Sequence, residues 1–132
     1  SDELEIAGTA IIGTIVPPLE RAPAANARVV DAFGNSLAEV SVDQQVQIEA
    51  DLVNGQDGDQ SFAYLVQVQD SDGVTVSLAW ITGQLSGGQS FSPALSWIPD
   101  ASGSYEATVF VWESVDNPTA LSDTASVSIT VV

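Results

Sequence analysis

The feature that most constrains the fold is a two-residue alternation of apolar and polar side chains that recurs along the chain. The clearest case is Gln45–Leu52, in which apolar residues at every second position alternate with polar ones: Val46, Ile48, Ala50 and Leu52 against Gln45, Gln47, Glu49 and Asp51. Successive side chains of a β-strand point to opposite faces of a sheet, so this period predicts a strand with one buried and one solvated face. No stretch shows a convincing helical period. We therefore expect an all-β chain.

Further strands are expected at intervals of roughly ten residues, separated by turns rich in Gly, Asp, Asn and Pro. The predicted strands are Arg28–Phe33, Leu37–Val42, Ser61–Gln69, Val74–Ile81, Gln89–Trp97, Ser104–Glu113 and Thr124–Val132. Pro93 indicates that the strand over Gln89–Trp97 lies at a sheet edge or contains a bulge, because proline cannot donate a hydrogen bond to a neighbouring strand. This spacing predicts an immunoglobulin-like antiparallel β-sandwich of about seven strands.

One local motif supports this fold class. Gly103, Tyr105 and Ala107 have the spacing of the tyrosine corner of immunoglobulin-type domains, and Ala107 stands where antibody domains place their second cysteine. The chain contains no cysteine. Apolar side chains between the two sheets must therefore supply the stability.

The strand predicted over Ser104–Glu113 is apolar on both faces. Tyr105, Ala107, Val109 and Val111 share one face, and Phe110 and Trp112 share the other. The favoured interpretation is a central strand with one side covered by a loop. A contact with another subunit is the alternative.

An extension strand is expected ahead of the sandwich, over Leu4–Val16 (LEIAGTAIIGTIV). The segment that follows, Pro17–Asn26, is rich in proline and is expected to be a stiff, extended linker. A long apolar strand on a stiff linker suits pairing with a distant partner better than folding back as a hairpin. We therefore divide the chain into a donor-type strand (1–16), a linker (17–26) and a β-sandwich (27–132). The candidate donor residues lie on the even-numbered face: Leu4, Ile6, Gly8, Ala10, Ile12 and Val16.

Composition excludes several classes of function. The chain of 132 residues carries 18 acidic and 2 basic residues, a net charge of −16, and contains neither histidine nor methionine. Such an acidic surface repels nucleic acid and anionic lipid, so neither is an expected partner. Serine–histidine, cysteine–histidine and HExxH sites are impossible, as is a lysine nucleophile, since Arg21 and Arg28 are the two basic residues. We expect no enzyme, no catalytic residue and no membrane span.

Calcium is the one metal that the acidic turns bring into consideration. Asp57 and Asp59, in the turn Asn54–Asp59, are the candidate ligands. The turn has the composition of a calcium loop but lacks the spacing of an EF-hand and its closing glutamate. Solvated turn residues are the favoured interpretation, and we assign no metal or cofactor.

Five segments of the chain carry a family resemblance: VVDAFGN (Val29–Asn35), DQQVQIEADLVNGQD (Asp43–Asp57), FAYLVQVQDSDGVTVSLAWITG (Phe62–Gly83), FSPALSW (Phe91–Trp97) and GSYEATVFVWESVDNPTALS (Gly103–Ser122). They resemble the immunoglobulin-like modules of secreted surface proteins of ammonia-oxidising archaea and their relatives. The resemblance covers about residues 27–132 and implies an extracellular β-sandwich. Those proteins commonly carry the module within larger chains, whereas here Leu4–Val16 precedes it, and this difference indicates self-assembly.

Two functions of different classes remain open. The first is a structural subunit of an extracellular, pilus-like filament, in which the donor strand of one copy inserts into the sandwich of the next, head to tail. The alternative is a monomeric adhesin, surface-layer or spacer module that binds a glycan or another surface protein through its loops. Both place the chain outside the cell. A start at Ser1 without methionine predicts removal of a secretory signal peptide, with a scar left by tag removal as the alternative. The acceptor core is expected on the last two strands, at Val109, Val111, Val127 and Ile129.

Overall fold

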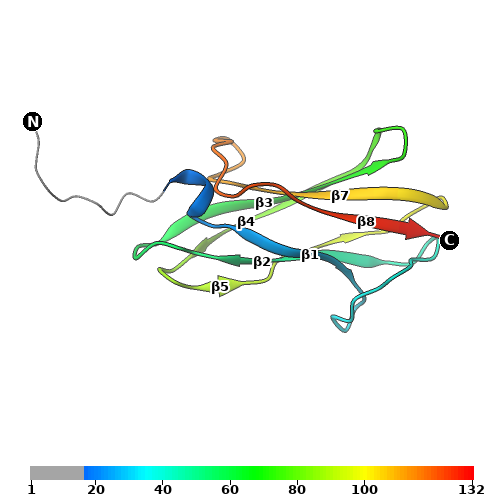
Figure 1. Cartoon of the computed structure of the whole chain (residues 1–132), viewed down its shortest axis with the longest axis horizontal. Helices are drawn as coiled ribbons and strands as arrows, with labels where there is room; N and C mark the ends of the chain where they lie inside the picture. The colour runs from blue at the N-terminus through cyan, green and yellow to red at the C-terminus, as the bar shows by residue number, and fades with distance from the viewer. Residues whose placement is uncertain (1–16) are drawn as a thin grey trace, which may run out of the picture.

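A computed structural model describes residues 17–132, which form two antiparallel sheets packed face to face (Figure 1). One sheet joins β1 (Ala24–Val30) to β2 (Val46–Val53), and β2 pairs on its other side with β5 (Ser90–Phe91) and β6 (Ala94–Trp97). The other sheet has the order β4 (Thr75–Leu85), β3 (Gln60–Asp70), β7 (Gly103–Trp112) and β8 (Ala125–Val131). The prediction of an antiparallel all-β sandwich is confirmed.

Two sequence predictions have different outcomes within this architecture. Pro93 interrupts its strand as predicted, because β5 ends before it and β6 begins after it. The strand expected over Leu37–Val42 is wrong, since this segment makes one isolated parallel bridge, from Val40 to Val131. Asp43 adopts a positive φ of 67° directly after the segment, which ends the extended backbone there.

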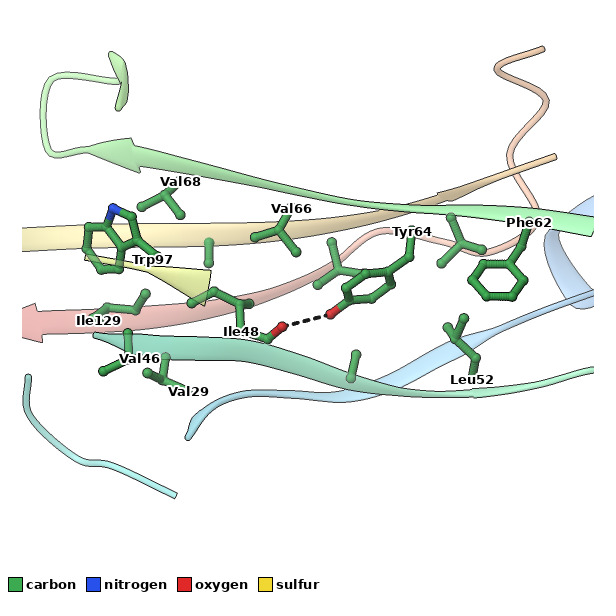
Figure 2. Packing of buried hydrophobic residues seen from close by; sticks show 14 of the residues in the cluster. Val29, Val46, Ile48, Leu52, Phe62, Tyr64, Val66, Val68, Trp97 and Ile129 are labelled. Carbon is green, nitrogen blue, oxygen red and sulfur yellow. Dashed lines mark hydrogen bonds between the residues drawn. The ribbon is translucent and has the colours of Figure 1, made fainter. Parts of the chain in front are cut away.

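The core lies between the two inner faces, where alternate residues of both sheets interdigitate (Figure 2). Tyr64, on β3, is fully buried, and its hydroxyl donates a hydrogen bond of 3.2 Å to the backbone carbonyl of Ile48 on β2 (Figure 2). A buried hydroxyl needs such a partner, because an unpaired polar group in an apolar interior is costly. Tyr64 therefore joins the two sheets by a polar contact as well as by apolar packing.

The predicted tyrosine corner is present at the start of β7. The hydroxyl of Tyr105 donates a 2.8 Å hydrogen bond to the carbonyl oxygen of Ala101, four residues upstream. The ring of Tyr105 also packs edge-on against Trp97, with the ring centroids 5.1 Å apart. This contact ties β7 to β6 in the opposite sheet.

The proline-rich segment differs from the extended linker that the sequence predicts. Pro18–Glu20 form a 3-10 helix, η2, in which the amide of Glu20 donates to the carbonyl of Pro17 at 2.9 Å. Proline suits the first position of a helical turn, because its φ is fixed near the required value. Ala22 is buried and its amide donates to Leu121, and β1 already begins at Ala24. This segment is therefore docked on the sandwich from Arg21 onwards, where the carbonyl of Arg21 accepts from the amide of Gly55.

Substitution of Tyr64 tests the contact between the sheets. Burial, with a further contribution from the carboxylate of Glu49, raises the pKa of the Tyr64 phenol above its usual value. Tyr64→Phe removes the hydrogen bond and should lower the free energy of unfolding by about 1 kcal/mol at pH 7. The check is urea denaturation of both proteins at pH 7 and at higher pH.

The pH dependence has a defined sign. Above about pH 10 the phenol ionises in the unfolded chain while the buried Tyr64 stays protonated, so wild-type stability falls as pH rises. Phenylalanine cannot ionise, so the deficit of Tyr64→Phe should shrink above that pH. A deficit that stays constant from pH 7 to pH 11 would contradict this assignment.

Candidate functional site

The two lateral seams of the sandwich, where the edges of the sheets face one another, are closed to different degrees. On the first seam, between β1 and β8, neighbouring segments bond to both edge strands. The amide of Leu37 donates to Val29 on β1 at 2.9 Å, and the amide of Val40 donates to Thr130 on β8 at 2.9 Å. These bonds satisfy part of the edge backbone on this side.

The second seam, between β4 and the β5–β6 edge, leaves a long strand unpaired. Within residues 17–132, β4 pairs with β3 alone, and no backbone hydrogen bond from another segment reaches β4 between Thr75 and Gln84. Natural sheets protect such edges with charge, proline, short length or bulges. The 11 residues of β4, TVSLAWITGQL, contain no charge and no proline, and the β3–β4 register shifts once, at the Thr75 end. This edge is open to another strand.

A groove of about 280 Å³ lies beside this edge, between β4 and β5. Its volume is at the lower end of the ~300–1,000 Å³ of small-molecule sites, which leaves room for a few aliphatic side chains. The rings of Phe62 and Phe91 stand 6.3 Å apart, centroid to centroid. Gly83 makes space for Phe62, since a Cβ at this position would lie 3.0 Å from the ring. Four apolar side chains line the groove, Phe62, Ile81, Leu85 and Phe91, together with Thr82, Gly83, Gln84 and Gln89.

A buried amide holds the wall of the groove at the Leu85 end. Asn54 is buried, and its side-chain nitrogen donates to the carbonyl oxygens of Gly58, Leu85 and Ser86 at 2.8, 3.1 and 3.0 Å. Its backbone amide also donates to Gln89 at 2.9 Å. Asn54 thus fixes the loop after β4 against the turn after β2.

The predicted acceptor residues lie together but are covered by the chain itself. Val109 and Val111 on β7 and Ile129 on β8 are buried, and Val127 is partly buried against the same core cluster. The groove along β4 lies on the opposite side of the described part of the chain, whereas Ile129 also lines a second hollow, described below. The periodicity of β7 and β8 indicates core positions but carries no information about which seam is open. The predicted donor residues (Leu4, Ile6, Gly8, Ala10, Ile12 and Val16) lie outside the described residues.

The acidic turn Asn54–Asp59 is held by hydrogen bonds of the Asn54 side chain, which donates to Gly58 and accepts from the amide of Gln56. Asp57 and Asp59 are exposed at its tip. Among the residues that the structure describes, no three acidic side chains gather in a group that could hold a metal ion. The same residues contain no helix long and apolar enough to cross a bilayer.

A second hollow, of about 450 Å³, lies where the β3–β4 turn meets β7 and β8. Its lining is largely hydroxyl-bearing, with Ser104, Ser128 and Thr130, and it includes the carboxylates of Asp70 and Glu106. Such a lining suits a polar ligand better than an apolar strand.

Comparisons with known proteins identify the fold. No protein-family model matches the sequence, and no curated protein matches it. Among solved structures, the chain is similar to the C-terminal domain of wzt, with a TM-score of 0.68 and 15% identity over 86% of this chain and 74% of that one. It is also similar to a CARDB domain from Pyrococcus furiosus that was solved in complex with di-metal ions, with a TM-score of 0.60 and 14% identity over 89% of this chain and 98% of that one.

A β-glucosidase from Listeria innocua contains a similar domain, with a TM-score of 0.58 and 13% identity over 83% of this chain. The match spans 15% of that enzyme. At these identities the likeness concerns the fold alone. The chain has the immunoglobulin-like β-sandwich fold.

Replacement of Asn54 tests the support of the groove wall. Asn54→Asp places a carboxylate among carbonyl oxygens that require a donor, so the free energy of unfolding should fall by about 3 kcal/mol or more. Gln84→Glu, an exposed amide-to-acid change on β4, should change it by less than about 0.5 kcal/mol. The measurement is chemical denaturation of both variants. Equal effects would show that the three contacts of Asn54 do not hold this wall.

Proposed function

We propose that the chain is a structural subunit of an extracellular filament, in which Leu4–Val16 of one copy adds as a strand to the β4 edge of the next. The observation that carries the proposal is the edge itself: β4 is long, uncharged, free of proline and unpaired within the described residues. Its exposure is unusual for a natural edge strand, and a partner strand accounts for it. The extracellular setting rests on the sequence resemblance.

The donor segment matches this edge in length. Leu4–Val16 has 13 residues and β4 has 11. Strand addition gains affinity from main-chain hydrogen bonds along the edge and specificity from alternate side chains seated in pockets. The even-numbered face of the segment would enter the seam, where the apolar groove lies beside Ile81 and Phe91. Small residues on that face, Gly8 and Ala10, fit between larger core side chains.

The opposite face of the donor segment fits the outer side of the same edge. Its odd-numbered positions include Ala7, Ile11 and Ile15. On β4, the alternate side chains that face solvent are also apolar: Val76, Leu78 and Trp80. A strand added beside β4 would meet apolar neighbours on both faces, which accounts for the apolar residues that the segment carries on its odd-numbered face beside polar ones such as Thr9.

The position of the first described residues allows a head-to-tail assembly. Figure 1 shows η2 at one end of the sandwich and the C-terminus at the other. A copy that donates its segment keeps its own β4 edge free for the next donor. Such a contact joins two different surfaces, and it builds an open fibre where the rotation does not close a ring.

Insertion into the same copy is the competing arrangement. The amide of Gly55 donates to Arg21 just after η2, and the amide of Asn54 donates to Gln89 at the groove, so both features lie at one end of the sandwich. Strand donation between copies predicts a polymer, whereas insertion within a copy predicts a monomer. The mass in solution separates the two.

A monomeric adhesin, surface-layer or spacer module is the second candidate function. The hollow lined by Ser104, Ser128 and Thr130 favours it, because hydroxyl groups suit a polar ligand such as a glycan. This function needs no N-terminal donor and predicts a monomer at all protein concentrations.

Paired charge substitutions in the donor segment test the proposal. Ile12→Asp places a carboxylate on the face that enters the seam, whereas Thr9→Asp places it on the opposite face. Burial of an unpaired carboxylate costs several kcal/mol, so Ile12→Asp should raise the protein concentration needed for polymerisation at least about a hundredfold. Thr9→Asp should have a much smaller effect. Both are measured by sedimentation and by negative-stain electron microscopy of the full chain.

Two outcomes would overturn strand donation. Equal effects of the two substitutions would remove the assignment of an inserted face. A wild-type chain that stays monomeric at millimolar concentration would favour insertion within one copy or the monomeric module.

A further inference from the structure

The outer face of the larger sheet, formed by β4, β3, β7 and β8, carries an apolar cluster that core packing does not explain. We call the outer apolar face the side chains of Leu65, Val76, Leu78, Trp80, Phe110 and Trp112. Val76, Leu78 and Trp80 are 46%, 56% and 51% exposed. Leu65 on β3 pairs with Trp80 on β4 and with Phe110 on β7, so these three side chains form one row across the sheet. The ring of Trp112 extends the cluster, 6.2 Å from that of Phe110.

This face is nearly free of charge in a chain that carries −16. Its four strands contain two of the 18 carboxylates, Asp70 and Glu106, and both lie towards the β3–β4 turn. The other sheet differs, since its outer face groups Arg28 with Glu49 and Asp51 at 3.4 and 3.1 Å. The outer apolar face is thus the sheet surface on which a second copy meets least electrostatic repulsion.

The distribution of charge favours a second copy of the chain as the partner of this face. At physiological ionic strength the Debye length is about 8 Å, so two acidic copies repel mainly through carboxylates that face each other closely. Contact through the outer apolar face keeps most carboxylates apart and removes Leu78 and Trp80 from water. A single patch of this kind is self-complementary under a two-fold rotation, the commonest symmetry of protein dimers.

We propose that the outer apolar face is a second self-association surface, through which two copies pack sheet against sheet. The contact is distinct from strand addition, because it uses the face of the sheet and leaves the backbone edge of β4 free. In a filament it joins neighbouring fibres side by side. It also accounts for the apolar residues on both faces of β7, since Phe110 and Trp112 would pack against the second copy while Val109 and Val111 pack in the core.

The test compares three full-length variants by sedimentation equilibrium across protein concentration. Ile12→Asp limits head-to-tail growth and should form a dimer. Adding Phe110→Glu places a charge on the outer apolar face and should weaken dimerisation at least tenfold. Adding Ser96→Glu instead introduces the same charge on the exposed outer side of β6 and should leave the dimer unchanged.

Leu78→Glu provides a second variant, because its exposed side chain contributes little to the fold. It should weaken the dimer as Phe110→Glu does while the circular dichroism spectrum stays native. An Ile12→Asp chain that is monomeric at every concentration would overturn the proposal, and so would equal dimerisation of the Phe110→Glu and Ser96→Glu variants. The test compares the average molecular mass of the Phe110→Glu and Ser96→Glu variants, so it remains valid even if Ile12→Asp chains still polymerise.

Discussion

The structure depends on the need to cover the apolar inner faces of two sheets without a disulfide. Burial of these faces drives the sheets together, and Tyr64 adds a hydrogen bond across the gap to Ile48. The edge strands of the two sheets are covered unequally, because packing of one sheet on the other does not pair the backbone at their edges. Segments next to β1 and β8 bond to one pair of edges, whereas β4 is left with an unpaired backbone among the described residues. The candidate site and the proposal of strand donation follow from this asymmetry.

One sheet of this molecule combines little charge with exposed apolar side chains on its outer face. The strands of the larger sheet carry two carboxylates in a chain of net charge −16, and their outward residues include Trp80 and Phe110. High net charge keeps a protein soluble but opposes contact between copies. The exposed apolar side chains Val76, Leu78 and Trp80 stand together on one sheet face, and such a grouping favours some orientations of approach between copies over others. Both proposed contacts, at the edge and on the face, use this sheet of low charge.

Sequence periodicity predicted most strands, since alternation in stretches such as Gln45–Leu52 admits no other regular structure. It could not say which face of a strand points inward. On β4 the apolar residues Val76, Leu78 and Trp80 face solvent, while Ser77 and Ala79 face the seam. Long-range contacts decide this orientation, because β3 fixes the register of β4. Sequence periodicity also could not show which seam is open, because this depends on how distant segments, such as the one that contains Leu37, bond to the edges of the other seam.

The central claim is that the N-terminal segment of one copy lies along β4 of another, and disulfide trapping tests it most directly. The chain has no cysteine, so introduced pairs are unambiguous. Chains carrying Ile12→Cys are mixed with chains carrying a cysteine on the seam side of β4, at Ser77, Ala79 or Ile81, and then oxidised mildly. Adjacent strands bring Cβ atoms close enough for a disulfide, so one of the three mixtures should give a covalent heterodimer. A heterodimer formed instead with Ser126→Cys on β8, or no heterodimer with any β4 position, would contradict the account.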